Sequence, residues 1–271
     1  MSALPAGDPL PKLGLAPRAS VPDSAAWRET RAALQAGIDL GLTLLSTGPD
    51  TETLVGEAIV RRRDEVFVVA RLAPWEATTD GMAAACTASL RRLATDVIDL
   101  YLLHGRGDVP LEESAEAFET LRQGGLIRHW GVADCPLPAL TELFLYTDRC
   151  AAEEIVYDLA HRGAEWDLLD GCRDHGMPVL ACCPLQSRGH PRLGDLAARH
   201  RVTPAQLALA WVLSHEGMVA VPPVSTRAEV AEHHAALAIE LDGHDFARLD
   251  EAFVPPLGPQ PLERRPPPVS V

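Results

Sequence analysis

Short apolar runs alternate along the chain with longer segments in which apolar residues recur every three or four positions. The short runs are rich in β-branched residues and bounded by polar turns, which is typical of buried parallel strands. We assign strands to residues 13–15, 41–46, 66–72, 97–104, 129–133, 154–157, 179–183 and 219–222. The clearest helical periods cover residues 26–40, 79–93, 111–124 and 203–215.

Eight strands with intervening helices are the count of a (β/α)8 TIM barrel, an α/β fold whose catalytic groups lie at the carboxyl ends of the strands. No linker divides the pattern. We therefore predict one barrel over residues 1–253 and a Pro-rich C-terminal tail over residues 254–271.

Composition narrows the class of partner. The chain has 271 residues and a net charge of −14, which argues against nucleic acid and against an anionic membrane surface. No apolar run reaches the ~18 residues of a spanning helix, and the N-terminus lacks a signal-peptide pattern. The six cysteines are scattered without a CxxC pair, as expected of free thiols in a reducing cytoplasm. A small-molecule substrate is the expected partner, and the oligomeric state is left open.

Several segments, in chain order, carry a specific resemblance. They read ALQAGID at 33–39, LVGEAI at 54–59, SLRRLATDVIDLYLLH at 89–104, GLIRHWGV at 125–132 and TPAQLALAW at 203–211. Together they resemble the aldo-keto reductase family over residues 11–253. The resemblance implies a TIM barrel, here with shortened loops, that uses NADPH to reduce carbonyls.

The catalytic positions implied by the resemblance are altered. The family uses an Asp, a Tyr, a Lys and a His, of which only His104 is kept. Ser46 stands at the Asp position, the loop around Asp50 is shortened and lacks the Tyr, and Arg71 replaces the Lys. Arginine presents a planar charged fork where lysine is a compact cation, and an isolated hydroxyl is a poor proton donor.

The cofactor positions implied by the resemblance are altered as well. Acids, a thiol and an imidazole replace amide, aromatic or cationic side chains at Asp134, Glu154, Cys182, Glu229 and His233. Glu229 falls where a cation usually meets the 2′-phosphate, so its carboxylate is expected to repel NADPH, with Arg227 as a partial compensation. We therefore expect the barrel to have lost hydride transfer and to use no cofactor.

The leading hypothesis is cofactor-free acid/base chemistry on a small carbonyl-bearing metabolite, by a non-redox lyase, isomerase or cyclase of bacterial biosynthesis. His104 is the main acid/base, Asp134 or Glu154 the second, and Arg71 orients the substrate. Ser46, Asp50, Tyr157 and Cys182 are expected around the same pocket.

Other interpretations stay open. One is an NADPH-dependent carbonyl reductase with an atypical proton relay, in which Arg71 and His104 polarise the carbonyl. Another is a catalytically silent barrel that acts as a partner or regulator, with Arg71, Asp134 and Glu154 forming a structural ion-pair network. A metal site is not expected, because these residues lack a local ligand motif. His233 is expected to face solvent.

Overall fold

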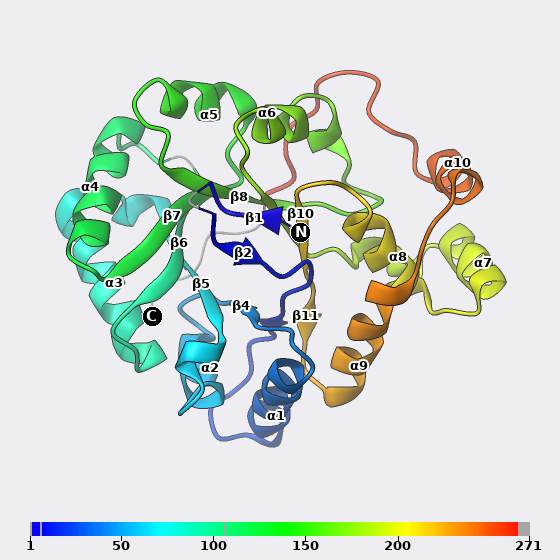
Figure 1. Cartoon of the computed structure of the whole chain (residues 1–271), viewed down its shortest axis with the longest axis horizontal. Helices are drawn as coiled ribbons and strands as arrows, with labels where there is room; N and C mark the ends of the chain where they lie inside the picture. The colour runs from blue at the N-terminus through cyan, green and yellow to red at the C-terminus, as the bar shows by residue number, and fades with distance from the viewer. Residues whose placement is uncertain (1, 6, 106, 265–271) are drawn as a thin grey trace.

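The computed structural model describes residues 2–5, 7–105 and 107–264. Seven parallel strands form one curved sheet in the order β10-β9-β8-β7-β6-β5-β4 (Figure 1). Their bounds are β4 (Leu44–Ser46), β5 (Phe67–Leu72), β6 (Ile98–His104), β7 (Ile127–Ala133), β8 (Cys150–Val156), β9 (Val179–Cys182) and β10 (Met218–Val221). The eighth position belongs to residues 13–15, where Leu13 bridges to Ala220 and Leu15 to Leu45. The sheet thus closes on itself, and the predicted (β/α)8 barrel is confirmed.

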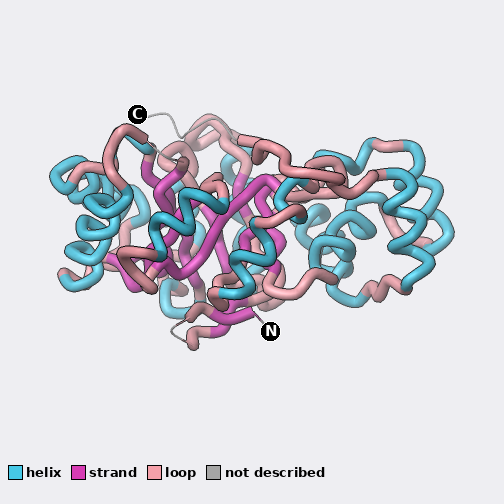
Figure 2. The backbone as a smooth tube through the Cα atoms, turned by 90° about the horizontal axis from the view of Figure 1, so that it is seen from above, coloured by secondary structure: helices cyan, strands magenta, loops and turns pink. Residues whose placement is uncertain are grey.

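Helices cover the outside of this barrel. They are α1 (Ala25–Asp39), α2 (Glu52–Ala58), α3 (Thr79–Leu93), α4 (Leu111–Gln123), α5 (Leu137–Phe144), α6 (Leu168–Asp174), α7 (Pro191–His200), α8 (Pro204–Leu213), α9 (Arg227–Ala235) and α10 (Gly243–Ala252). Short 3-10 turns are η1 (Arg63–Glu65), η2 (Pro74–Glu76), η3 (Gly163–Glu165), η4 (Gln186–Gly189) and η5 (Ala236–Ala238). Figure 2 shows helices on both sides of the barrel strands, with a larger group of helices extending to the right of the view.

Local sequence explains where the helices begin. The hydroxyl of Thr203 accepts from the backbone N–H of Gln206, and the side-chain oxygen of Gln206 accepts from the backbone N–H of Thr203. This capping box, with Pro204 in the first turn, begins α8 as the sequence predicts. All four predicted helices occur with ends that agree within about two residues.

A small N-terminal hairpin closes one end of the barrel. Its strands are β1 (Ser2–Ala3) and β2 (Pro9–Leu10), and they pair antiparallel. Leu4 and Leu10 pack against the apolar interior of the barrel, which includes Leu44 and Leu100. Another short pair, β3 (Ala16–Pro17) with β11 (Pro223–Val224), lies beside α1. With one end filled by apolar side chains, the polar residues of the interior gather at the carboxyl ends of the strands.

Two details of the fold differ from the sequence prediction. The sixth strand of the barrel begins at Cys150, so Glu154 lies well inside it instead of opening it. His233 is 2% exposed, so the prediction that it faces solvent is wrong, because its face of α9 packs inward.

The fifth and sixth strands of the barrel approach each other closely at Gly131. A Cβ on Gly131 would lie 2.3 Å from the Ala152 carbonyl oxygen, so only glycine permits this close strand pairing.

No helix or strand is found in residues 254–264, and the rest of the predicted tail, 265–271, lies outside the described residues. None of the helices in the described part of the chain has both the length and the apolar composition needed to cross a membrane.

Candidate active site

An arginine is held at the carboxyl end of the barrel by residues from two other strands. Arg71 of β5 donates from Nε to Glu154 Oε2 (2.7 Å) and from Nη2 to Glu154 Oε1 (3.2 Å). The same Nη2 donates to Ser46 Oγ at 2.6 Å. Glu154 is fully buried and the Arg71 side chain is 13% exposed. Because the guanidinium fork is already engaged, Arg71 is poorly placed to orient a substrate carboxylate, and the ion-pair interpretation fits it better.

A second pair joins the ends of the next two strands. His104 closes β6 and Asp134 follows β7, with His104 Nε2 lying 3.1 Å from Asp134 Oδ2. Their side chains are 6% and 2% exposed. Nδ1 of His104 is buried and has no hydrogen-bond partner among the described residues. Since buried polar atoms are normally paired, this nitrogen marks a position where a ligand atom would complete the site.

The backbone at Asp134 is unusual. Its φ is +54°, in the left-handed region that few residues other than glycine adopt. The Asp134 backbone N–H donates to the Glu154 carbonyl oxygen at 2.9 Å, which anchors this conformation to β8. Such conformations cost free energy and are concentrated at functional sites.

Glu153 is a buried acid that the sequence reasoning missed. It precedes Glu154 on β8, and its Oε1 accepts from the Cys135 backbone N–H at 2.9 Å. Burial raises the pKa of Glu153 well above its usual range. Successive residues of a strand face opposite sides, so Glu153 faces the helices while Glu154 faces the barrel interior. The signal that could have identified Glu153 is the presence of two adjacent acids in one predicted strand. Because they face opposite sides, a cation that pairs with one of them does not reach the other.

The remaining predicted pocket residues are dispersed. Cys182 is buried at the end of β9, and Asp50 is exposed just before α2. Tyr157 is fully buried, stacks on Trp211 at 5.1 Å between ring centres, and donates to Glu165 Oε1 at 2.8 Å. Tyr157 is therefore a packing residue away from the pocket in which it was predicted.

The tyrosines lie in packing layers or on the surface, although Tyr101 also lines the cavity that adjoins Arg71. The chain has three tyrosines, and Tyr157 is one of them. Tyr101 is buried with its ring edge-on to Phe118, in the layer between the sheet and the helices. Tyr146 lies just after α5 and is 52% exposed. The only lysine, Lys12, precedes the first strand segment, at the opposite end from the strand termini that carry His104.

Glu229 is neutralised where the sequence predicts repulsion. Its carboxylate accepts from Arg18 Nη1 at 2.6 Å and from the backbone N–H groups of Ser225 (2.7 Å) and Thr226 (3.1 Å). Burial alone would raise the pKa of Glu229, but these hydrogen bonds hold it below its usual range. Thr226 in turn accepts from the Glu229 N–H, which completes a capping box for α9. A phosphate nearby would thus meet an ion pair and not a lone carboxylate.

Several buried polar side-chain atoms have no hydrogen-bond partner among the described residues. They include His104 Nδ1, Ser187 Oγ in η4, and His233 Nδ1 in the last turn of α9. Burial lowers the pKa of His233, and the cations of Arg18 and Arg188 act on it in the same direction. Hydrogen-bonding groups and cations on successive loops suit an extended anionic ligand such as a dinucleotide.

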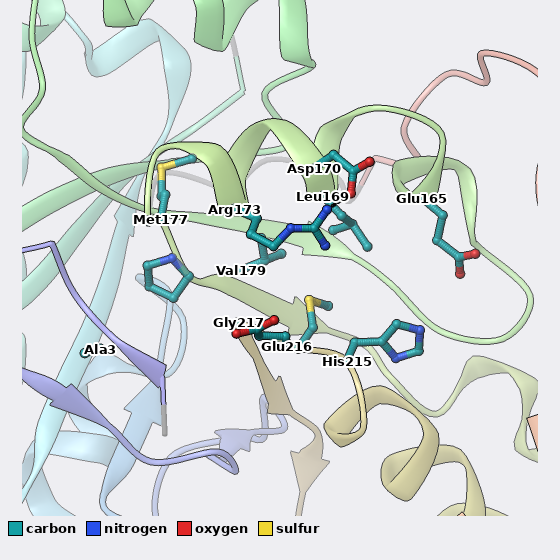
Figure 3. Close-up of a pocket in the computed structure, with 13 residues that line it drawn as sticks. Ala3, Glu165, Leu169, Asp170, Arg173, Met177, Val179, His215, Glu216 and Gly217 are labelled. Atoms are coloured by element: carbon teal, nitrogen blue, oxygen red, sulfur yellow. Dashed lines mark hydrogen bonds and ion pairs between the residues drawn. The ribbon is translucent and has the colours of Figure 1, made fainter. Parts of the chain in front are cut away.

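The cavities do not by themselves identify the site. A hollow of about 410 Å³ lies at the other end of the barrel, beside the first residues of β9 and β10 (Figure 3). Arg173 and Asp170 of α6 lie on one side of it and His215 and Glu216 on the other. A cavity of about 360 Å³ adjoins Arg71. Because TIM barrels carry catalysis at the strand carboxyl ends, we assign the site to His104 and its neighbours.

Comparison with known proteins defines the family to which this chain belongs. The sequence profile of the Aldo/keto reductase family matches residues 18–253, and the chain belongs to this family. It is similar to the methylglyoxal reductase YeaE of Escherichia coli, with 40% identity over 257 residues that cover 89% of this chain and 90% of the relative. It is also similar to a crystal structure of an aldo/keto reductase from Klebsiella pneumoniae in complex with NADP and acetate. That similarity has a TM-score of 0.93 and 38% identity, covering 97% of this chain and 99% of the other.

These relatives overturn two expectations drawn from the sequence. The cofactor-free lyase, isomerase or cyclase is contradicted, because the 40% identical relative is named as a reductase. The expectation of no cofactor is contradicted by structures 38% identical that are described with NADP and with NADPH. The physical error was to treat each substituted residue as isolated: Glu229 is charge-balanced by Arg18, 211 positions away.

Proposed function

We propose that the protein is an NADPH-dependent reductase of small carbonyl compounds, with ketoaldehydes such as methylglyoxal as the substrate class. The observation that carries the proposal is the similarity, over 97% of the chain, to a structure described in complex with NADP. The name of the E. coli relative supports the substrate class. The position of His104 at the strand ends supports a site that acts on a carbonyl oxygen.

The residues at the strand ends fit the cofactor. Ser187, His233 and Arg188 would hold its phosphates and adenosine, because they supply positive charge and hydrogen-bonding atoms without a partner among the described residues, while Arg18 is paired with Glu229. When bound, the reduced nicotinamide would supply the hydride for the carbonyl carbon.

The protein's own contribution is orientation and charge. His104 offers the carbonyl oxygen a hydrogen-bonding nitrogen from a buried position. The Arg71–Glu154 pair and Ser46 stiffen the mouth of the barrel and add a fixed dipole beside His104. A buried, preorganised site of this kind needs little rearrangement when charge develops on the oxygen.

Residues 1–253 are proposed as one domain and residues 254–271 as its tail. A cytoplasmic location is proposed because the six cysteines form no disulfide among the described residues.

Cofactor binding tests the proposal directly. NADPH is titrated into the purified protein while the tryptophan fluorescence and the NADPH emission are followed, with NADH as the comparison. Saturable binding at micromolar NADPH is expected. The absence of saturation up to about 1 mM of either dinucleotide, the upper end of ordinary substrate affinities, would overturn the proposal.

A further inference from the structure

Reduction of a carbonyl requires a proton for the oxygen, and the described site contains no tyrosine to give it. Tyr101 and Tyr157 are buried in packing layers and Tyr146 is exposed on the surface. Arg71 stays charged at every working pH, and Glu154 is committed to it. Of the side chains at the strand ends, the imidazole of His104 is the one suited to deliver a proton near neutral pH.

We propose that His104 is the proton donor and that Asp134 is the positioning residue that makes it one. This inference rests on the proposed reductase activity and goes one step further, since it names the group that takes over the role of a phenol. It does not depend on the identity of the carbonyl substrate.

The geometry of the pair assigns a role to each ring nitrogen. Nε2 lies 3.1 Å from Asp134 Oδ2, so its N–H donates to the carboxylate and fixes the plane of the ring. Nδ1 then remains for the substrate, and it is buried without a partner among the described residues. An acid that orients an imidazole and balances its positive charge is a recurring arrangement in acid/base catalysis.

The backbone holds the carboxylate in place. The left-handed conformation of Asp134 and its N–H bond to the Glu154 carbonyl keep the side chain directed at His104. Among the described residues, Glu154 of the neutral Arg71–Glu154 ion pair faces the same barrel interior as His104, whereas Glu153 faces the helices. Burial raises the pKa of Glu153 and its Oε1 accepts from the Cys135 N–H, so Asp134 is the carboxylate in contact with the His104 imidazole.

The carbonyl carbon gains a hydride from the reduced dinucleotide while its oxygen takes the proton from Nδ1 of the His104 imidazolium. The products are the alcohol and the oxidised dinucleotide, and the neutral imidazole recovers a proton from solvent. Asp134 stays a carboxylate throughout, as the charge-balancing acid does in comparable dyads.

The test compares wild type with Asp134→Asn, since asparagine has the same size and tolerates the left-handed backbone. The kcat for NADPH-dependent reduction should fall roughly 10²- to 10⁴-fold, the usual contribution of general acid catalysis. The alkaline limb of the kcat–pH profile should move to lower pH, while NADPH binding changes less than about twofold. Glu153→Gln, which removes a neighbouring acid that faces away from the site, should leave both kcat and the profile unchanged.

A measurement on the unmutated protein tests the same point without activity. Imidazole ¹H–¹⁵N spectra, with His104 assigned by comparison with His104→Gln, should show a proton on Nε2. An unprotonated Nε2 would overturn the dyad even if Asp134→Asn fails to fold.

The two proposals fail in different ways. If the wild-type protein binds and oxidises NADPH but Asp134→Asn keeps its kcat and pH profile, only the dyad is wrong. If the wild type neither binds nor oxidises NADPH, the reductase proposal is wrong.

Discussion

Single side chains at the barrel mouth are held by paired charges that come from distant parts of the chain. Arg71 and Glu154 are separated by 83 positions, yet they share two hydrogen bonds in a buried setting. A buried ion pair contributes little net stability compared with apolar residues, but removing one partner leaves an uncompensated charge. The pair therefore fixes geometry more than it stabilises the fold.

Glu154→Leu should lower the free energy of unfolding by about 3–5 kcal/mol, because it leaves the Arg71 guanidinium buried and unpaired. The double variant Arg71→Met/Glu154→Leu should recover most of this loss, since it removes both charges. Urea denaturation of the two variants and the wild type measures the difference. A double variant as unstable as the single one would show that the two charges are not coupled.

Glu153 should make the free energy of unfolding depend on pH. The direction is opposite to that of an acid paired with a cation, which stabilises the folded state at high pH. Burial raises its pKa in the folded state above the unfolded value, so the folded protein binds more protons in the interval between them. Its contribution to stability is therefore present at low pH and is lost as the pH rises through the folded pKa.

Glu153→Gln should accordingly raise the melting temperature at pH 8, because burying Glu153 at that pH lowers the stability of the folded protein. The difference should shrink as the pH falls towards 4, because both side chains are then neutral. A gain of 1 kcal/mol corresponds to about 2–4 °C for a protein of this size. A difference that stays constant across this pH range would contradict the burial argument.

The beginning of α9 combines a structural cap with a candidate cofactor contact. Its capping residues are readable from the sequence, because Thr226 and Glu229 are spaced as a capping box. The partner Arg18 is not readable, since it lies on a different element. The resemblance to the family places the 2′-phosphate near Glu229, so this helix terminus should influence the choice of dinucleotide.

Glu229→Gln should strengthen NADPH binding by at least about fivefold, the effect of roughly 1 kcal/mol for one charge contact in water-like surroundings. Glutamine keeps the capping box and frees the charge of Arg18 for the phosphate. NADH, which lacks that phosphate, should bind as before. Glu240→Gln, an equal charge change at an exposed position, is the matched control. An equal gain in affinity for NADPH and NADH would show that Glu229 does not influence the choice between the two dinucleotides.

The fold as a whole could be predicted because its signals are local and repeated. Apolar runs, helix periods and a family resemblance gave the eight-stranded barrel, with strand ends shifted by a few residues. The N-terminal hairpin was missed because β1 and β2 are two residues each and show no periodicity. Both faces of a barrel strand are buried, so sequence alone did not separate Glu153 from Glu154.

The function was misjudged for a related reason. The sequence shows which residue type stands at a position but not which residue it contacts. Arg71, Asp134 and Glu229 were therefore taken as signs that hydride transfer and cofactor binding had been lost. In the folded chain each is held in a defined contact with Glu154, His104 or Arg18. The pairing of His104 with Asp134 required two strand ends to be brought together, which no local pattern predicts.

The hairpin that closes the barrel should contribute to the stability of the entire molecule. Leu10 is 2% exposed and packs against the interior leucines of the strands. Leu10→Ala should lower the free energy of unfolding by about 2–5 kcal/mol, as for other buried leucines. Leu257→Ala, at a position 89% exposed, should have almost no effect in the same denaturation experiment. An unchanged stability for Leu10→Ala would mean that the barrel interior closes without the hairpin.

We propose that this barrel reduces small carbonyls with NADPH through His104. The most direct measurement is the loss of NADPH absorbance at 340 nm on addition of methylglyoxal, with wild type and His104→Ala at equal concentration. We predict steady NADPH consumption by the wild type and at least about a hundredfold slower consumption by His104→Ala. No consumption by a wild-type protein that is folded, or equal rates for the two proteins, would contradict it.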